Sequence, residues 1–270
     1  MNALVMGAKG QLGSELVRLL GTDAAVPHDR LSITDAAAVE ALVAARKPAV
    51  VFNCAAYNAV DRAETEPELA YAVNAEGPLN LAISSRRHGA TLVHFSTNFV
   101  FDGAEDRPYV EADEPAPLSV YGKSKLEGER RALEAGPHLL IVRTAAVFGG
   151  PQSFPQRILE RARSGDRLRV VSDQKVNPTF ARDLAAAAVD LAERGAAGIV
   201  HAVAEGCAGW DDFARAVLVE RGVEAAVESI PTHAYPSAAR RPLNGCLATT
   251  RYRPLRHWRE AVREWAASRE

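Results

Sequence analysis

The sequence has little of several features that mark specialised classes of protein. Its three cysteines, Cys54, Cys207 and Cys246, are odd in number and widely spaced, so neither a disulfide nor a zinc knuckle is indicated. Its 7 histidines form no pair at metal-ligand spacing, so we predict no protein-bound metal. The 32 basic and 34 acidic residues leave a net charge of −2, which gives no sign of binding to nucleic acid or to an anionic membrane.

Long apolar runs are also missing. No stretch approaches the roughly 18 residues of a membrane span, and residues 1–7 lack the basic and apolar regions of a signal peptide. We therefore expect no membrane association and a cytoplasmic location. The remaining composition, 47% hydrophobic and 24% charged, is that of a globular protein. Its 270 residues suffice for one large α/β domain, or for a large domain with a smaller annex.

Short apolar runs alternate with helical patterns, which predicts βαβ units and a parallel sheet. The runs are continuous rather than alternating, as expected for strands covered on both faces. The expected strands are 3–6, 50–54, 91–96, 139–143, 168–171 and 198–202. The expected helices are 11–20, 36–45, 66–87, 123–134, 155–164 and 180–194, followed by an amphipathic helix with Trp258, Ala261, Val262 and Trp265 on one face.

The predicted fold is thus a doubly wound α/β sheet of the Rossmann type with a smaller C-terminal substrate-binding region. From Gly149 onward proline and glycine become more frequent and the alternation becomes irregular. We predict a dinucleotide-binding domain over 1–148 and a mainly substrate-binding region over 149–270. The late strands near 168–171 and 198–202 are expected to rejoin the sheet of the first domain.

Three glycines directly follow the first expected strand. Gly7, Gly10 and Gly13 permit a tight turn, close approach of backbone to a phosphate, and packing of the next helix on the strand. The N-terminus of that helix offers free N–H groups and a positive dipole end. The pattern therefore predicts a site for the pyrophosphate of a dinucleotide. Its G-x-x-G-x-x-G spacing favours an extended short-chain reductase over a medium-chain dehydrogenase.

Residues near Val26, where the second strand of such a fold ends, bear on the choice of cofactor. Asp29 can accept hydrogen bonds from a ribose 2′-hydroxyl, which favours NADH, whereas Arg30 can face a 2′-phosphate, which favours NADPH. A solvated surface pair is a third interpretation. The two residues together do not decide between the cofactors, and of the two we prefer NADPH slightly.

A tyrosine and a lysine four residues apart predict acid–base catalysis. On a helix Tyr121 and Lys125 share one face, and a nearby ammonium is expected to lower the tyrosine pKa toward the working range. Thr97, at the end of a strand, can hydrogen-bond a substrate carbonyl oxygen. Together with the glycine turn, these residues predict hydride transfer between a nicotinamide cofactor and a carbonyl or alcohol.

Longer segments carry a resemblance to a known family. They are 10–13 (GQLG), 53–61 (NCAAYNAVD), 63–68 (AETEPE), 73–78 (VNAEGP), 96–103 (STNFVFDG), 117–126 (PLSVYGKSKL), 143–144 (RT), 173–174 (DQ), 178–179 (PT), 181–184 (ARDL) and 240–244 (RRPLN). With them the chain resembles dTDP-4-dehydrorhamnose reductases, extended short-chain reductases acting on nucleotide sugars, nearly from end to end.

The resemblance implies a set of site residues. The implied catalytic groups are Thr97, Tyr121 and Lys125, the last two also touching the cofactor. The implied cofactor contacts, together with Gly7 and Arg30, are Gly10, Gln11, Leu12, Asp29, Ser32, Ile33, Ala55, Ala56 and Tyr57. Ser32 stands where the family usually has an acidic residue near the adenine.

The departures from the family lie in the expected substrate pocket. Asn98 and Phe99 replace Asp and Tyr, and Ala145 and Ala146 replace Ser and Trp. The loss of a tryptophan removes a large apolar wall, so the chemistry is expected to be kept and the substrate changed; drift within one activity is the other interpretation. The predicted substrate contacts are Thr97, Asn98, Phe99, Ala146, Asn177, Thr179 and Arg241, the last facing a diphosphate or lying at the surface.

We predict NAD(P)H-dependent reduction of a ketone, foremost the 4-keto group of a dTDP-4-keto-6-deoxyhexose, with Tyr121 as proton donor. Alternatives are a ketoreductase for a non-sugar or modified substrate, and a non-catalytic nucleotide-binding subunit such as the regulatory subunit of methionine adenosyltransferase, which resembles the same family. An epimerase or dehydratase with tightly held NAD is a further alternative, disfavoured because no acidic pair follows Thr97. The expected partner is a small molecule, and the expected state is a monomer or homodimer.

Overall fold

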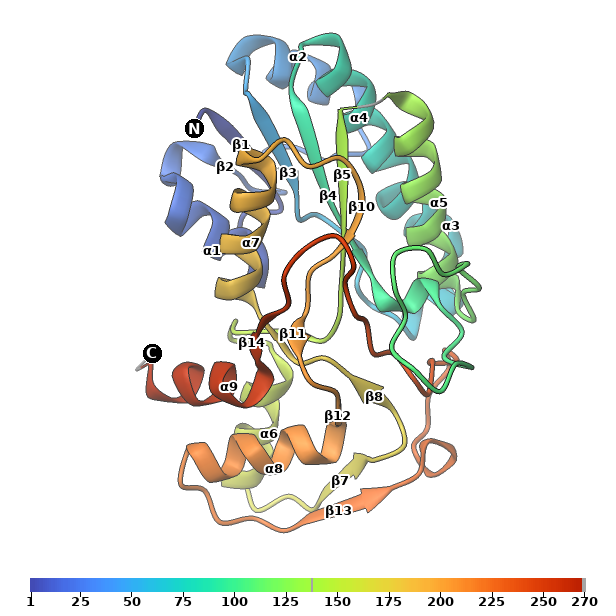
Figure 1. Cartoon of the computed structure of the whole chain (residues 1–270), viewed down its shortest axis with the longest axis vertical. Coiled ribbons are helices and arrows are strands. Elements are labelled where there is room, and N and C mark those ends of the chain that lie inside the picture. Colours follow the sequence, from blue (N-terminus) through green and yellow to red (C-terminus); the bar gives the residue numbers. More distant parts are fainter. Residues whose placement is uncertain (137, 269–270) are drawn as a thin grey trace.

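A computed structural model describes residues 1–136 and 138–268 (Figure 1). Its larger part is a six-stranded sheet in the order β10-β5-β4-β3-β1-β2, and every neighbouring pair is parallel. The strands are β1 (Ala3–Met6), β2 (Ala25–Val26), β3 (Val50–Asn53), β4 (Thr91–Thr97), β5 (Leu139–Thr144) and β10 (Gly198–His201). The predicted doubly wound α/β fold is confirmed.

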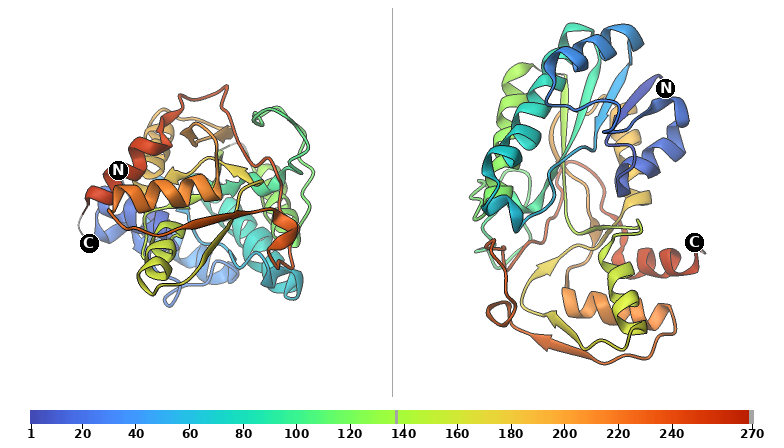
Figure 2. Two further views of the ribbon diagram at one scale, coloured as in Figure 1. Left: turned by 90° about the horizontal axis from the view of Figure 1, so that it is seen from below. Right: turned by 180° about the vertical axis from the view of Figure 1, so that it is seen from behind.

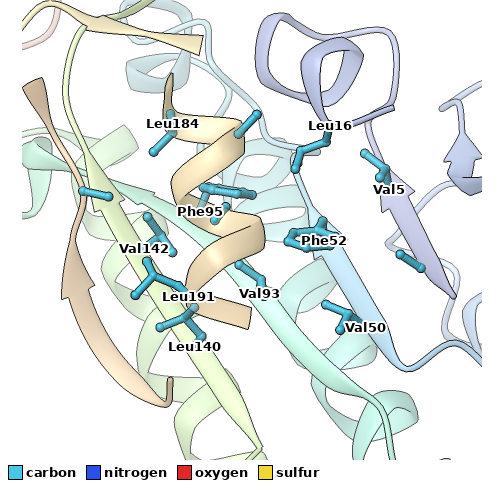
Figure 3. Close-up of a cluster of buried hydrophobic side chains, with 14 of the residues drawn as sticks. Val5, Leu16, Val50, Phe52, Val93, Phe95, Leu140, Val142, Leu184 and Leu191 are labelled. Atoms are coloured by element: carbon cyan, nitrogen blue, oxygen red, sulfur yellow. The ribbon is translucent and has the colours of Figure 1, made fainter. Parts of the chain in front are cut away.

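Helices cover both faces of this sheet, which explains the continuous apolar runs. One face packs against α1 (Gln11–Leu20) and α7 (Ala181–Glu193), and the core there contains Phe52 and Val93 (Figure 3). The opposite face, with Leu4 and Ile141, is covered by α2 (Ala36–Arg46), α4 (Gly77–Arg87) and α5 (Val120–Ala135). Successive strand residues therefore enter different cores, one on each face of the sheet.

The helix expected over 66–87 is interrupted. It consists of α3 (Pro67–Tyr71), a π-helical segment over Ala72–Glu76, and α4. Such bulges are frequent at functional sites, and this one contains the buried Asn74. Single-turn 3-10 helices cover Thr22–Ala24, Arg62–Glu64, Asn98–Val100 and Thr232–Ala234.

The smaller part lies beyond one end of the sheet (Figure 2). Its core is formed by α6 (Phe154–Arg163), α8 (Trp210–Glu220) and α9 (Trp258–Ala267), with Trp210 at the start of α8 packed on Phe154 at 4.8 Å between ring centroids. Its short strand pairs are β6 (Val147–Phe148) with β9 (Thr179–Phe180), β8 (Lys175–Val176) with β12 (Ala208–Gly209), and β11 (Ala204–Glu205) with β14 (Leu255–His257). None of the described helices is long and apolar enough to cross a membrane.

One expected strand joins a different sheet. The strand near 198–202 is β10 and extends the main sheet, as predicted, but β7 (Leu168–Val171) pairs instead with β13 (Val227–Ile230). Its apolar side chains pack under α6 and α8. A four-residue apolar run indicates burial and not which sheet it joins, so the expectation for 168–171 was wrong.

The cysteine expectation also needs correction. Cys207 and Cys246 form a disulfide, with their Cα atoms 6.0 Å apart, although 39 positions separate them. Both flank the buried Asn177, whose amide binds Gly206 O and the Leu247 N–H. Spacing along the chain could not reveal this pair because the fold alone brings the two segments together. Cys54 is free.

Candidate active site

The glycine turn after β1 is built for close approach of backbone. Gly7 has φ +72°, and a Cβ there would lie 2.7 Å from Ala55 N; a Cβ on Gly13 would lie 2.2 Å from Gly7 O. Gly10 is the N-cap of α1 and has no side chain to occupy the first N–H groups of the helix. These features fit a dinucleotide phosphate, because the free N–H groups and the positive dipole end of a helix N-terminus form an anion-binding site.

The next predicted cofactor residues lie around that turn. Leu12 packs on the core, and Gln11 Oε1 accepts a hydrogen bond from Gly150 N at 3.1 Å, which ties α1 to the start of the smaller part. Asp29 and Arg30 follow β2 and are exposed. Asp29 pairs with Lys9 at 3.1 Å, and this hydrogen bond lowers the Asp29 pKa. Sequence reasoning missed Lys9, which places a cation beside the predicted ribose site.

The adenine side and the loop after β3 complete this edge. Ser32 is bonded to Thr34, and Ile33 is buried where Gly77 of α4 leaves room for it. Ala55, Ala56 and Tyr57 follow β3 and are partly buried. The Tyr57 backbone is held at both ends by Asn74, which accepts its N–H at 2.8 Å and donates to its carbonyl at 3.1 Å.

The predicted catalytic residues are buried together at the carboxyl end of β4. Thr97 is the last residue of β4, and Tyr121 and Lys125 lie one turn apart at the start of α5. A Cβ on Gly122 would lie 2.3 Å from Phe99 O, so only glycine lets α5 begin so close to the loop after β4. This contact sets the Tyr121 ring edge-on to Phe99, with 5.4 Å between centroids.

The electrostatics of Tyr121 differ from the expectation. Burial raises its pKa to about 12, and a hydrogen bond with Thr97 opposes that rise. The expected lowering by the lysine is not found; the Lys125 amine donates to Phe95 O at 2.6 Å. Burial also lowers the pKa of Lys125 to about 8, against the attraction of Glu129.

Comparisons with known proteins show the family of this chain. The profile of the family described as RmlD substrate binding domain matches residues 1–270. A dTDP-4-dehydrorhamnose reductase of Aggregatibacter actinomycetemcomitans is 39% identical over 92% of this chain and 90% of its own length. A probable dTDP-4,6-dihydroxy-2-methyloxan-3-one 4-ketoreductase of Streptomyces antibioticus is 40% identical over 98% and 94%. The chain belongs to the dTDP-4-dehydrorhamnose reductase family.

A solved structure extends the agreement to the whole fold. The dTDP-4-dehydrorhamnose reductase of Bacillus anthracis, in complex with NADP, has a TM-score of 0.94 and 30% identity, covering 97% of each chain. As a member of the dTDP-4-dehydrorhamnose reductase family, the protein is an oxidoreductase. Among the residues that the structure describes, no group of three or more His, Cys, Asp or Glu side chains is arranged to hold a metal ion.

Two of the residues that depart from the dTDP-4-dehydrorhamnose reductase family, Asn98 and Ala146, form hydrogen bonds at the site. Asn98 is buried, donates from Nδ2 to Gly245 O at 3.0 Å, and accepts from the Thr97 hydroxyl at 3.3 Å. An aspartate could not donate to that carbonyl, so the amide joins the end of β4 to the C-terminal segment. Ala146 has φ +43° and accepts the Thr179 N–H at 3.2 Å.

The remaining predicted substrate residues form hydrogen bonds with other protein groups. Asn177 uses its amide on Ala204 O, Gly206 O and the Leu247 N–H, and the Thr179 hydroxyl donates to Asn177 O. Arg241 forms a two-pronged pair with Asp61, at 3.1 and 2.8 Å. These contacts place Asn177 and Thr179 in supporting positions and fasten Arg241 to the loop after β3.

Sequence reasoning missed a buried ion pair behind the lysine. Arg143, on β5, donates to Glu129 at 2.6 Å, and Ser96 also donates to this carboxylate. Arg143 and Glu129 are 2% and 1% exposed, and the guanidinium lies 5.2 Å from the Phe101 ring centroid. The only available signal was position: Glu129 lies one turn beyond Lys125 on the same helix face.

Proposed function

We propose that this protein reduces the 4-keto group of dTDP-4-dehydrorhamnose with NADPH, with Tyr121 as proton donor. The observation that carries the proposal is the burial of Thr97, Tyr121 and Lys125 together at the carboxyl end of β4. This end lies on the same edge of the parallel sheet as the glycine turn after β1, the edge where such sheets bind their ligands.

The residues at the glycine turn fit NADPH. A Cβ on Gly7 would meet Ala55 N and a Cβ on Gly10 would approach Gly7 O, so glycine keeps this turn tight. Gly10 also leaves the first N–H groups of α1 without a side-chain cap, where a pyrophosphate can bind. Lys9 and Arg30 flank Asp29 at the ribose position, and two cations beside one carboxylate favour a 2′-phosphate over a bare hydroxyl. When bound, NADPH supplies the hydride that the carbonyl carbon accepts.

The protein residues handle the proton. The Thr97 hydroxyl holds the substrate oxygen beside Tyr121, whose phenol gives its proton to that oxygen as the C–O double bond becomes single. The pKa of about 12 keeps the phenol protonated at neutral pH, as a donor in the reductive direction must be. Lys125, one helical turn away, does not shift the Tyr121 pKa in this structure. In the proposed reaction its ammonium is the counter-charge for the phenolate that is left.

The test is reduction of dTDP-4-dehydrorhamnose by purified protein, followed through loss of NADPH absorbance, with NADH in parallel. We expect Tyr121→Phe to lower kcat by at least about a hundredfold, the usual share of a general acid. Tyr235→Phe is the matched control, since Tyr235 is 48% exposed on a loop, and it should keep wild-type turnover. Equal turnover in Tyr121→Phe and wild type would refute the role of Tyr121.

A related dTDP-deoxysugar ketone is the second candidate substrate. Ala146 and Phe99 leave a smaller and less polar surround than the family's Trp and Tyr, and a relative similar to this chain over 98% of its length carries a name for a different 4-ketoreductase. The ratio of kcat/KM for the two ketones decides between them. Cofactor binding without turnover of either ketone would favour the regulatory-subunit alternative.

A further inference from the structure

A buried histidine lies next to the lysine, and the proposed mechanism does not use it. His94 is 0% exposed in the middle of β4 and is paired in register with Asn53, the last residue of β3. Asn53 Nδ2 lies 3.0 Å from His94 Nδ1, and His94 Nε2 lies 3.5 Å from Lys125 Nζ. The three side chains form a line from β3 across β4 to α5.

The position of the imidazole proton follows from this line. The Ala55 N–H donates to Asn53 Oδ1 at 3.2 Å, which fixes the amide so that its NH2 group faces the histidine. A donor on that side requires a lone pair on Nδ1. Burial, and then the Lys125 charge, lower the His94 pKa well below 6.5, so the ring is neutral. The single proton is therefore on Nε2, on the side of Lys125.

The Lys125 amine thus faces one hydrogen-bond acceptor and one hydrogen-bond donor. It donates to Phe95 O on β4, while an N–H of His94 faces it on the same strand. The other titratable groups near it are Glu129, which favours its charge from the next turn of α5, and the thiol of Cys54 after β3. Tyr121 lies one turn before it on α5. A donor opposite a donor opposes the ammonium form, whereas a lone pair in that place would support it.

We propose that His94, oriented by Asn53, is a positioning residue for Lys125. It fixes the place of the Lys125 amine relative to Tyr121, and its Nε2–H disfavours the ammonium form of that amine. The part of this inference that concerns turnover rests on the proposed function of Lys125. The tautomer and the lysine titration do not depend on it.

The first test reads the tautomer directly in the folded protein without substrate. Long-range ¹H–¹⁵N spectra separate the two nitrogens of each histidine ring, and His94→Phe assigns the signals of His94. We expect a neutral ring protonated on Nε2 at neutral pH. A ring protonated on Nδ1, or an imidazolium, overturns the proposal.

The second test is a double-mutant cycle. Asn53→Asp is almost isosteric, but its second carboxylate oxygen accepts rather than donates, so it should move the His94 proton to Nδ1 and turn a lone pair toward Lys125. We expect the Lys125 pKa to rise by about one unit, and by less than about half of that in the His94→Phe background, where only the new charge acts. An equal rise in both backgrounds overturns the proposal.

The lysine titration can be followed in ¹³C-lysine protein, because lysine occurs only at positions 9, 47, 123, 125 and 175. Lys125→Arg assigns the signal. In turnover, Asn53→Asp should move the alkaline limb of the kcat profile to higher pH, because the lysine then keeps its charge further into alkali. A failed proposed function would appear as absent turnover in the wild type, while both spectroscopic results would still decide the role of His94.

Discussion

At the scale of single residues, the Glu129–Arg143 pair is the most consequential buried interaction near the site. Both side chains are almost completely buried. Removing one charge therefore leaves the other without an opposite charge in the low-dielectric interior of the protein. We expect Glu129→Gln to lower the free energy of unfolding by about 3 to 5 kcal/mol, measured by urea denaturation. Glu134→Gln is the control, since Glu134 lies exposed on the same helix and should cost less than about 0.5 kcal/mol. Equal losses would contradict the expectation.

Which residues form the site was predictable where the signal is local. Tyr121 and Lys125 are four positions apart on one helix, and the glycines follow a strand directly, so spacing alone brings each group together. The partners of these residues were not predictable, because they come from distant positions. Phe95 O accepts a hydrogen bond from the Lys125 amine, and no pattern in the sequence predicts that partner.

At the scale of elements, the π-helical segment links the loop after β3, with its predicted cofactor contacts, to α5, which carries Tyr121 and Lys125. Asn74 binds both backbone groups of Tyr57 and also donates to Ser124, which stands between Tyr121 and Lys125 on α5. A Cβ on Gly128 would lie 2.0 Å from Asn74 O, so α5 packs directly on the bulge. The extra residue of the π turn thus lies where the loop after β3 and α5 meet.

Asn74→Ala should therefore weaken the binding of NADPH as well as lower the stability of the fold. The Tyr57 N–H and carbonyl lose their partners, which should cost about 2 kcal/mol of stability, and the loop after β3 loses its fixed position. We expect the NADPH dissociation constant, measured by titration of its fluorescence, to rise at least about fivefold, a loss of about 1 kcal/mol. Asn58→Ala, on the exposed neighbour in the same loop, should leave it unchanged. An unaltered constant in Asn74→Ala would refute the link.

The elements themselves were predictable to the extent that burial is periodic. The six strands of the main sheet needed only β2 to be added to the expected set, and β2 is two residues long, too short to leave a pattern. The helix over 66–87 was expected in one piece, because the π-helical segment keeps the chain helical from α3 into α4 and leaves no break in the pattern. The partner of β7 was missed because strand pairing is a long-range property.

At the scale of the whole molecule, one ion pair fastens the C-terminal segment to the loop after β3. Asp61 accepts two bonds from Arg241 and one from the Ala239 N–H, across some 180 positions of the chain. Asn98 makes a parallel connection to Gly245 from the end of β4. The C-terminal segment is therefore joined to the larger part of the protein at two points, Asp61 and Asn98.

The pH dependence of that connection has a definite sign. The Arg241 guanidinium lowers the pKa of Asp61 far below its usual value, so the pair contributes stability above the ordinary aspartate pKa of about 3.9 and loses it as the pH falls further toward the lowered value. Asp61→Asn removes this contribution at every pH. The Asp61 side chain is 46% exposed and screened by solvent, so we expect a loss below about 1 kcal/mol at neutral pH.

The same substitution should affect substrate more than stability, because it frees the segment that carries Arg241. We expect KM for the nucleotide sugar to rise several-fold with kcat nearly unchanged. The stability difference between Asp61→Asn and wild type should shrink as the pH falls below about 3.9, because the unfolded chain's Asp61 then takes up a proton that the paired carboxylate of the folded protein does not. Unfolding curves at neutral and acid pH, with steady-state kinetics at neutral pH, check both parts. A stability difference that stayed constant into acid would mean that the Asp61 charge does not fasten the two parts, and the KM effect would then need another cause.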